Sequence, residues 1–184
     1  DGAIAYSEKN MKSRARGEQM DRIADALMQQ RGEQGLIDWI NGIDHNVKEN
    51  DMLSYKQHAT RQAVEKIARN DRDKAIQFIS DNATEQFIDS DTLERTSRYV
   101  SRTSIADEVQ WLADLPSEVK GQRHALGERF EEFIKEDFAG AGDWLSSQPL
   151  GPSYDEAIQD YAMSAAKDNP EAALAWVDRI SDDR

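Results

Sequence analysis

The sequence contains no cysteine, only four prolines, and no apolar run long enough to cross a membrane. Without cysteine there can be neither disulfide bonds nor thiolate metal ligands. A membrane-spanning helix needs about 20 consecutive, mostly apolar residues, so we expect no membrane insertion. The scarcity of proline leaves long stretches free to form helices, and the 22 alanines favour helices that pack closely.

Basic residues are also in short supply. The chain holds 23 Lys and Arg against 36 Asp and Glu, a formal net charge of −13. Nucleic-acid binding needs a basic footprint that faces the phosphates, so we expect no nucleic-acid partner. The acidic excess is largest over residues 137–184, which hold ten acidic and three basic side chains. Two interpretations stay open: this segment faces a cationic partner, or the acidic side chains simply keep helix faces solvated.

What the sequence does have is a large aromatic residue at regular intervals. The intervals are 39, 33, 33 and 32 residues, and the aromatic residues are Trp39, Phe78, Trp111, Trp144 and Trp176. A fixed period of this length is typical of stacked supersecondary units, each too small to bury a core alone. We interpret each ring as a wedge between two helices, since a ligand site rarely recurs in every unit.

The residues around each aromatic predict a short helix that contains it. An apolar residue follows the aromatic in every unit: Ile40, Ile79, Leu112, Leu145 and Val177. Seven residues before the aromatic stands a residue type that can cap a helix N-terminus: Gly32, Asp71, Ser104, Asp137 and Asn169. Pro170 directly follows the last of these, in the first helical position that proline prefers. The sequence therefore predicts a helix start at each cap.

A second helix is expected before each of these caps. Nine residues before the aromatic, four of the five units carry a cation, which favours the C-terminal end of a helix: Arg69, Arg102, Lys135 and Lys167. An apolar residue stands eleven positions before the aromatic, and in the last three units another stands eighteen positions before it: Leu93, Leu126 and Ile158. A spacing of seven places both positions on one helix face. The predicted fold is all-α: a right-handed α-solenoid of about five antiparallel helical hairpins with a period of about 33 residues. We expect one domain over residues 1–184, with residues 1–7 as a linker or remnant.

Two segments resemble known helical repeats. The segment 154–158, Tyr-Asp-Glu-Ala-Ile, resembles the second helix of a tetratricopeptide repeat. Residues 169–176 are more similar to the Trp-centred bacterial repeats of the form Asp-Pro-Glu-Ala-Ala-Leu-x-Trp, with one change. This resemblance covers residues 105–184 and implies a helical-repeat architecture in the bacterial periplasm or cell envelope rather than the cytoplasm. It implies neither an activity nor functional residues.

Cationic and aromatic side chains on the predicted first helices are the candidate partner-binding residues. In most α-solenoids these helices line the concave surface, where such side chains can bind an extended peptide or an acidic segment. The candidates are Tyr55, His58, Arg61, Arg95, Arg98, Tyr99, Arg102, Arg123, His124 and Arg129. The alternative is that each arginine pairs with a local carboxylate, as Glu94 could with Arg98 one turn later.

Signatures of catalysis are missing from the sequence. There is no His-Glu-x-x-His, Gly-x-Ser-x-Gly or phosphate-binding Gly-x-x-x-x-Gly-Lys pattern, and His45, His58 and His124 share no ligand-like spacing. The carboxylates of residues 128–136 fit a solvated helix face better than an acid–base pair. The polar tract 44–51 absorbs the longer first interval, either as a partner contact or as a tolerated insertion, and lacks the central glycine of a calcium loop. We expect no enzyme activity, no cofactor and no metal.

The last predicted helix leaves an apolar stripe without a following helix to cover it. Trp176, Val177 and Ile180 form this stripe. We therefore expect the chain to be part of a longer array, or to associate with a second copy through this end. The sequence favours a non-catalytic helical-repeat scaffold that binds a protein or a peptide. The alternative is an accessory domain that gives shape to an exported cell-envelope enzyme.

Overall fold

A computed structural model describes residues 13–43, 50–100, 104–149, 151–167 and 169–181, and these residues form helices and connecting turns with no β-strand. The all-α prediction is thereby confirmed. The helices of this part of the chain are α2 (Ser13–Gly42), α3 (Asn50–Asn70), α4 (Arg72–Asp81), α5 (Ser90–Val100), α6 (Ile105–Asp114), α7 (Gln122–Glu136), α8 (Phe138–Ser147), the 3-10 turn η1 (Pro152–Tyr154), α9 (Asp155–Ala165) and α10 (Pro170–Val177).

Helix starts lie at the predicted caps. The side chain of Asp71 accepts a hydrogen bond from the backbone N–H of Lys74, and Ser104 does the same for Asp107. Asp137 accepts from the N–H of Gly140 at 2.9 Å. Each of these bonds satisfies one of the free N–H groups in the first turn of a helix. The three predicted caps are therefore confirmed.

The first predicted cap, Gly32, interrupts α2. Its φ of 63° and ψ of −159° are not helical, so α2 consists of two helical stretches joined at this residue. Glycine tolerates a positive φ because it has no Cβ. At the other end of the chain, Pro170 is the first residue of α10, as predicted.

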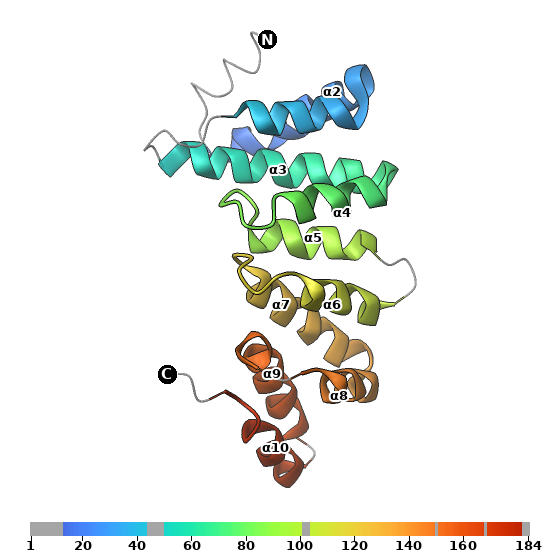
Figure 1. Cartoon of the computed structure of the whole chain (residues 1–184), viewed down its shortest axis with the longest axis vertical. Helices are drawn as coiled ribbons and strands as arrows, with labels where there is room; N and C mark the ends of the chain where they lie inside the picture. The colour runs from blue at the N-terminus through green and yellow to red at the C-terminus, as the bar shows by residue number, and fades with distance from the viewer. Residues whose placement is uncertain (1–12, 44–49, 101–103, 150, 168, 182–184) are drawn as a thin grey trace. The chain divides into compact units, whose positions relative to one another are not determined.

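The chain divides into two compact units, Asp1–Thr96 and Ser97–Arg184, with the division inside α5. In the first unit α3 contacts both α2 and α4 (Figure 1). The predicted wedge residues Trp39 and Phe78 are buried, as are Ile40 and Ile79, which follow them. The core of this unit therefore contains the residues that the period marked.

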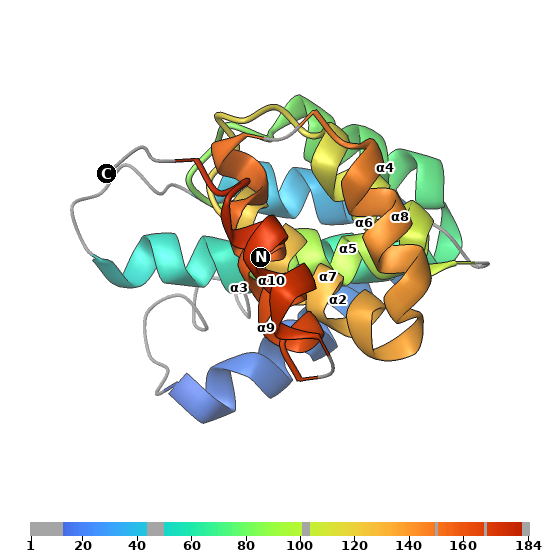
Figure 2. The same cartoon turned by 90° about the horizontal axis from the view of Figure 1, so that it is seen from below.

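In the second unit α7 contacts α6, α8 and α9, and α9 lies beside α10 (Figure 1 and Figure 2). Leu112 and Leu145, which follow two of the tryptophans, are buried. Trp111, Trp144 and Trp176 themselves are only half-buried. The Trp144 indole N–H donates to Gln110 Oε1 at 2.8 Å, so its polar edge has a partner at the protein surface.

Candidate functional site

The candidate site is an apolar groove of about 370 Å³ between α9 and α10. From α9 its walls include Gln159, Ala162 and Met163, together with the C-cap residue of this helix, Ala166. From α10 they include Pro170, Ala173, Leu174 and Val177. On each helix these residues follow the spacing i, i+3, i+4, i+7, which places them on one face. The groove therefore arises from two amphipathic helices that both turn an apolar stripe outward.

Three large apolar side chains in this groove are exposed to solvent. The exposed fractions are 55% for Met163, 65% for Leu174 and 47% for Val177. In the part of the chain that the structure describes, the other large apolar side chain exposed to this degree is Phe138. Contiguous apolar surface of this kind marks interaction sites in soluble proteins.

A cluster of carboxylates flanks the groove. Asp160 and Glu156 on α9 lie near Glu128 and Glu131 on α7, and burial raises the pKa of Asp160, with Glu131, Glu156 and Glu128 raising it further. Lys135 partly offsets this effect on the pKa of Asp160, but its Nζ lies 2.7 Å from Glu131 Oε1. The flank therefore carries excess negative charge, which a cationic ligand would relieve.

His124, one of the predicted partner-binding residues, lies at the edge of this carboxylate cluster. Its Nδ1 is 3.5 Å from Glu156 Oε1, and its Nε2 is 3.9 Å from Glu128 Oε1. The ring is exposed and becomes cationic only when it is protonated.

In the first unit, the predicted partner-binding residues are divided between core and surface. Tyr55 is 2% exposed, so its ring is part of the core. His58 is exposed, with its Nδ1 at 2.8 Å from the backbone oxygen of Ser54.

Both predicted arginines of the first unit have acidic partners. Arg61 lies 3.0 Å from Asp89 Oδ2 and 2.9 Å from Asp91 Oδ2. Arg95 lies 3.2 Å from Glu65 Oε2. This arrangement corresponds to the alternative in which each arginine pairs with a carboxylate, although the partners come from other helices or from loops.

In the second unit, Arg129 is buried against Glu108. Both are about nine-tenths buried, and the Nε and Nη2 atoms of Arg129 each lie 2.6 Å from Glu108 Oε2. Burial raises the pKa of Glu108, while the Arg129 guanidinium opposes this rise. Glu132 also contacts Arg129, and it lies 3.5 Å from Arg98. The pair holds α6 against α7.

The remaining candidates differ in exposure. Arg98 and Arg123 are exposed, whereas Tyr99 is half-buried. Arg102, His45 and positions 44–49 of the polar tract lie outside the described residues.

The apolar stripe predicted to be uncovered consists of Trp176, Val177 and Ile180, and of these three residues Val177 lines the groove. The exposure of Met163 on α9 was not predicted. The spacing of Met163 from Gln159 was the available signal, but the same helix carries a second apolar stripe, which includes Ile158 and Tyr161 and is buried. Spacing alone does not say which stripe stays uncovered.

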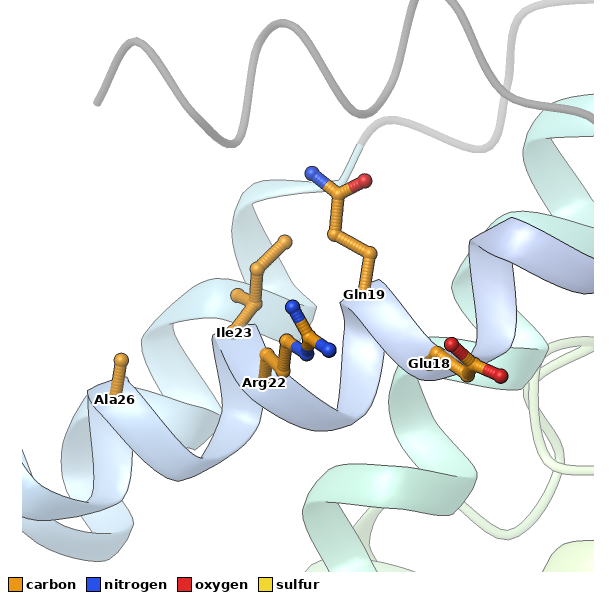
Figure 3. A pocket seen from close by; sticks show the side chains of 5 residues that line it. All are labelled: Glu18, Gln19, Arg22, Ile23 and Ala26. Carbon is orange, nitrogen blue, oxygen red and sulfur yellow. The ribbon is translucent and has the colours of Figure 1, made fainter.

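A second hollow, of about 460 Å³, lies along the first part of α2. Figure 3 shows its lining side chains, which are Glu18, Gln19, Arg22, Ile23 and Ala26. All five come from one helix, and they mix opposite charges with small apolar surface. This hollow offers less apolar surface for a ligand than the α9–α10 groove.

Within the described ranges, no three His, Asp or Glu side chains are grouped so that they could hold a metal ion. None of the helices in the same ranges has the length and apolar character of a membrane span. Comparison with protein-family models, with curated proteins and with solved structures finds no match to this chain. The function is therefore argued from the geometry of the chain itself.

Proposed function

We propose that this protein is a non-catalytic helical-repeat scaffold that binds a protein or a peptide. The observation that carries the proposal is the α9–α10 groove, whose exposed apolar residues include Met163, Leu174 and Val177. Such residues cost free energy in water, at roughly 25 cal/mol per Å² of apolar surface, and a partner that covers them recovers it.

The finer architecture that goes with this function is a right-handed α-solenoid of about five antiparallel helical hairpins, with a period of about 33 residues. The caps Asp71, Ser104 and Asp137 support it, because they begin second helices at intervals of 33 residues. The hydrogen bond between Trp144 and Gln110 supports it too, because it joins two of these second helices, α6 and α8. A stacked array of this kind presents long continuous surfaces for binding.

We also propose that exposed members of the predicted cationic set contribute secondary contacts. In the second unit these are Arg98, Arg123 and His124. The charges of Arg98 and Arg123, and that of His124 when it is protonated, would attract an acidic segment of a partner and would affect the association rate more than the dissociation rate. Arg98→Glu should then slow association without changing the groove.

Selection from a displayed peptide library against the full chain tests the proposed function. Binders should be recovered, and their affinity should fall at least tenfold with Leu174→Glu, because a charge then occupies the groove. Ala175→Glu is the matched control: it adds the same charge to the neighbouring exposed position of α10, outside the groove. Circular dichroism should show equal helicity for both variants. Failure to recover any binder that distinguishes Leu174→Glu from the control would contradict the proposal.

A further inference from the structure

We infer that the α9–α10 groove binds an amphipathic α-helix of a separate polypeptide, with the apolar face of that helix in the groove and its basic face against the carboxylates of α9. This inference rests on the proposed binding function and names the partner of the same groove.

The chain already contains a helix docked in this manner. α9 packs on both α7 and α8. The ring of Tyr161 on α9 stacks on Phe138, with the ring centroids 4.6 Å apart and 9° between their planes. Glu156 lies over Gly127, where an added Cβ would come within 2.8 Å of its Cδ. The surface formed by α7 and α8 is thus a working receptor for a helix.

The groove repeats that receptor surface 32 residues later. On α7 the residues in contact with α9 include Gly127 and Phe130, and their counterparts are Gln159 and Ala162. On α8 they include Phe138 and Gly142, and their counterparts are Pro170 and Leu174. All four counterparts line the groove. Gln159, Pro170 and Leu174 are exposed in the described structure, so the groove is an open surface of the same kind.

Differences between the two surfaces indicate which side chains would fit. Ala162 replaces the larger Phe130, which leaves the hollow of about 370 Å³. A helix that binds here must therefore bring a large apolar side chain, such as Leu or Phe, to fill it. Leu174 stands at the position that corresponds to Gly142 of α8. The Tyr161 ring packs in the space beside Gly142, and the Leu174 side chain fills the corresponding space in the groove.

Charge determines the other face of the bound helix. Asp160 and Glu156 lie three and seven residues before Met163, on the same side of α9 as this groove residue. The raised pKa of Asp160 shows that nearby cations do not compensate for its burial and its acidic neighbours. Lysine or arginine along the flank of the bound helix would supply that compensation.

A second copy of this chain fits the groove poorly. A second copy would bring its own net charge of −13 against an acidic flank. A separate helix with a basic face avoids this cost.

Three synthetic peptides can test this inference against the full chain, with binding measured by fluorescence anisotropy and calorimetry. The first carries leucine at i, i+3, i+4 and i+7 over two repeats and lysine on its flanks. The second has the same leucines with glutamate on its flanks. The third has the composition of the first in a scrambled order that forms no stripe. We expect the first to bind at least tenfold more tightly than the other two, and to gain helicity when bound.

Substitutions in the chain locate the bound helix. Leu174→Glu should weaken binding of the lysine peptide at least tenfold, although the new charge alone would attract lysine. The control Ala175→Glu should leave the affinity unchanged or slightly tighter. Glu156→Gln with Asp160→Asn should weaken binding several-fold and reduce its dependence on salt concentration.

Three results would overturn the inference: equal binding of the scrambled peptide, equal effects of the two glutamate substitutions, or a dimer that excludes the peptide in light scattering. If library selection yields extended peptides that require Leu174 while the lysine helix does not bind, the helical partner is wrong and the proposed binding function stands. If neither binds, both fail.

Discussion

The Tyr161 hydroxyl lies where a Cβ at residue 142 would be, so α9 can approach α8 this closely only because residue 142 is glycine. Close packing of the two helices is therefore the physical reason for glycine at this position of α8.

Gly142→Ala should therefore lower the free energy of unfolding by about 1–2 kcal/mol, since the new methyl group must displace the buried Tyr161 ring. The steric cost has to exceed the gain of about 1 kcal/mol that alanine brings to a helix interior. Urea unfolding measures the net change. Gly42→Ala is the control, because a Cβ there meets no atom within 4 Å. Adding Tyr161→Phe should restore part of the loss, and a stabilised Gly142→Ala protein would refute the steric argument.

Loss of Arg129 should destabilise the second unit strongly. Arg129→Met leaves Glu108 buried without its main counter-charge, and breaking such pairs costs about 3 kcal/mol. Arg129→Met combined with Glu108→Met should recover most of that loss, because no buried charge remains. Chemical unfolding of the single and double variants gives the coupling between the two residues. Additive losses would show that the pair does not act as a unit.

The carboxyl of Asp160 should make stability depend on pH in a defined direction. Its pKa is raised in the folded state by burial and by Glu131, Glu156 and Glu128, with Lys135 opposing. The folded protein therefore binds this proton more tightly than the unfolded chain, and the contribution of Asp160 to stability falls as pH rises from below about 4 through the raised folded-state pKa.

Asp160→Asn should accordingly raise the Tm at pH 7 by about 2 °C and have no effect near pH 3, where the carboxyl is protonated in both states. Differential scanning fluorimetry across this pH range measures the difference. Glu118→Gln, at an exposed position between α6 and α7, is the charge-matched control. A benefit of Asp160→Asn that persists at pH 3 would point to packing rather than charge.

Removal of a cap should cost more than removal of the same side chain elsewhere. Ser104→Ala takes away the oxygen that accepts from the N–H of Asp107, and we expect a loss of about 1 kcal/mol. Ser146→Ala, at an exposed position within α8, should be neutral or stabilising because alanine favours helices. Thermal unfolding of both variants decides the matter. Equal effects would mean that the Ser104 hydrogen bond contributes nothing measurable.

Helix starts could be predicted because the interactions that set them are local. A cap such as Asp137 bonds to an N–H only three residues away, so both partners lie in one short segment. Placement of the predicted binding residues could not be predicted in this way. Tyr55 and Arg129 share the helical spacing of exposed residues, yet both are buried by contacts with distant segments.

The sequence alone specified the all-helical fold, the caps Asp71, Ser104 and Asp137, and the spacing of the large aromatic residues, because each depends on residues close together in the chain. The tertiary structure decided which apolar stripe of α9 is covered and which is left open as a groove. That choice depends on contacts between residues far apart in the chain, such as Tyr161 with Phe138 and Trp144 with Gln110. A stripe of apolar residues has the same spacing whether or not another helix packs on it, so only the packed structure distinguishes core from binding surface.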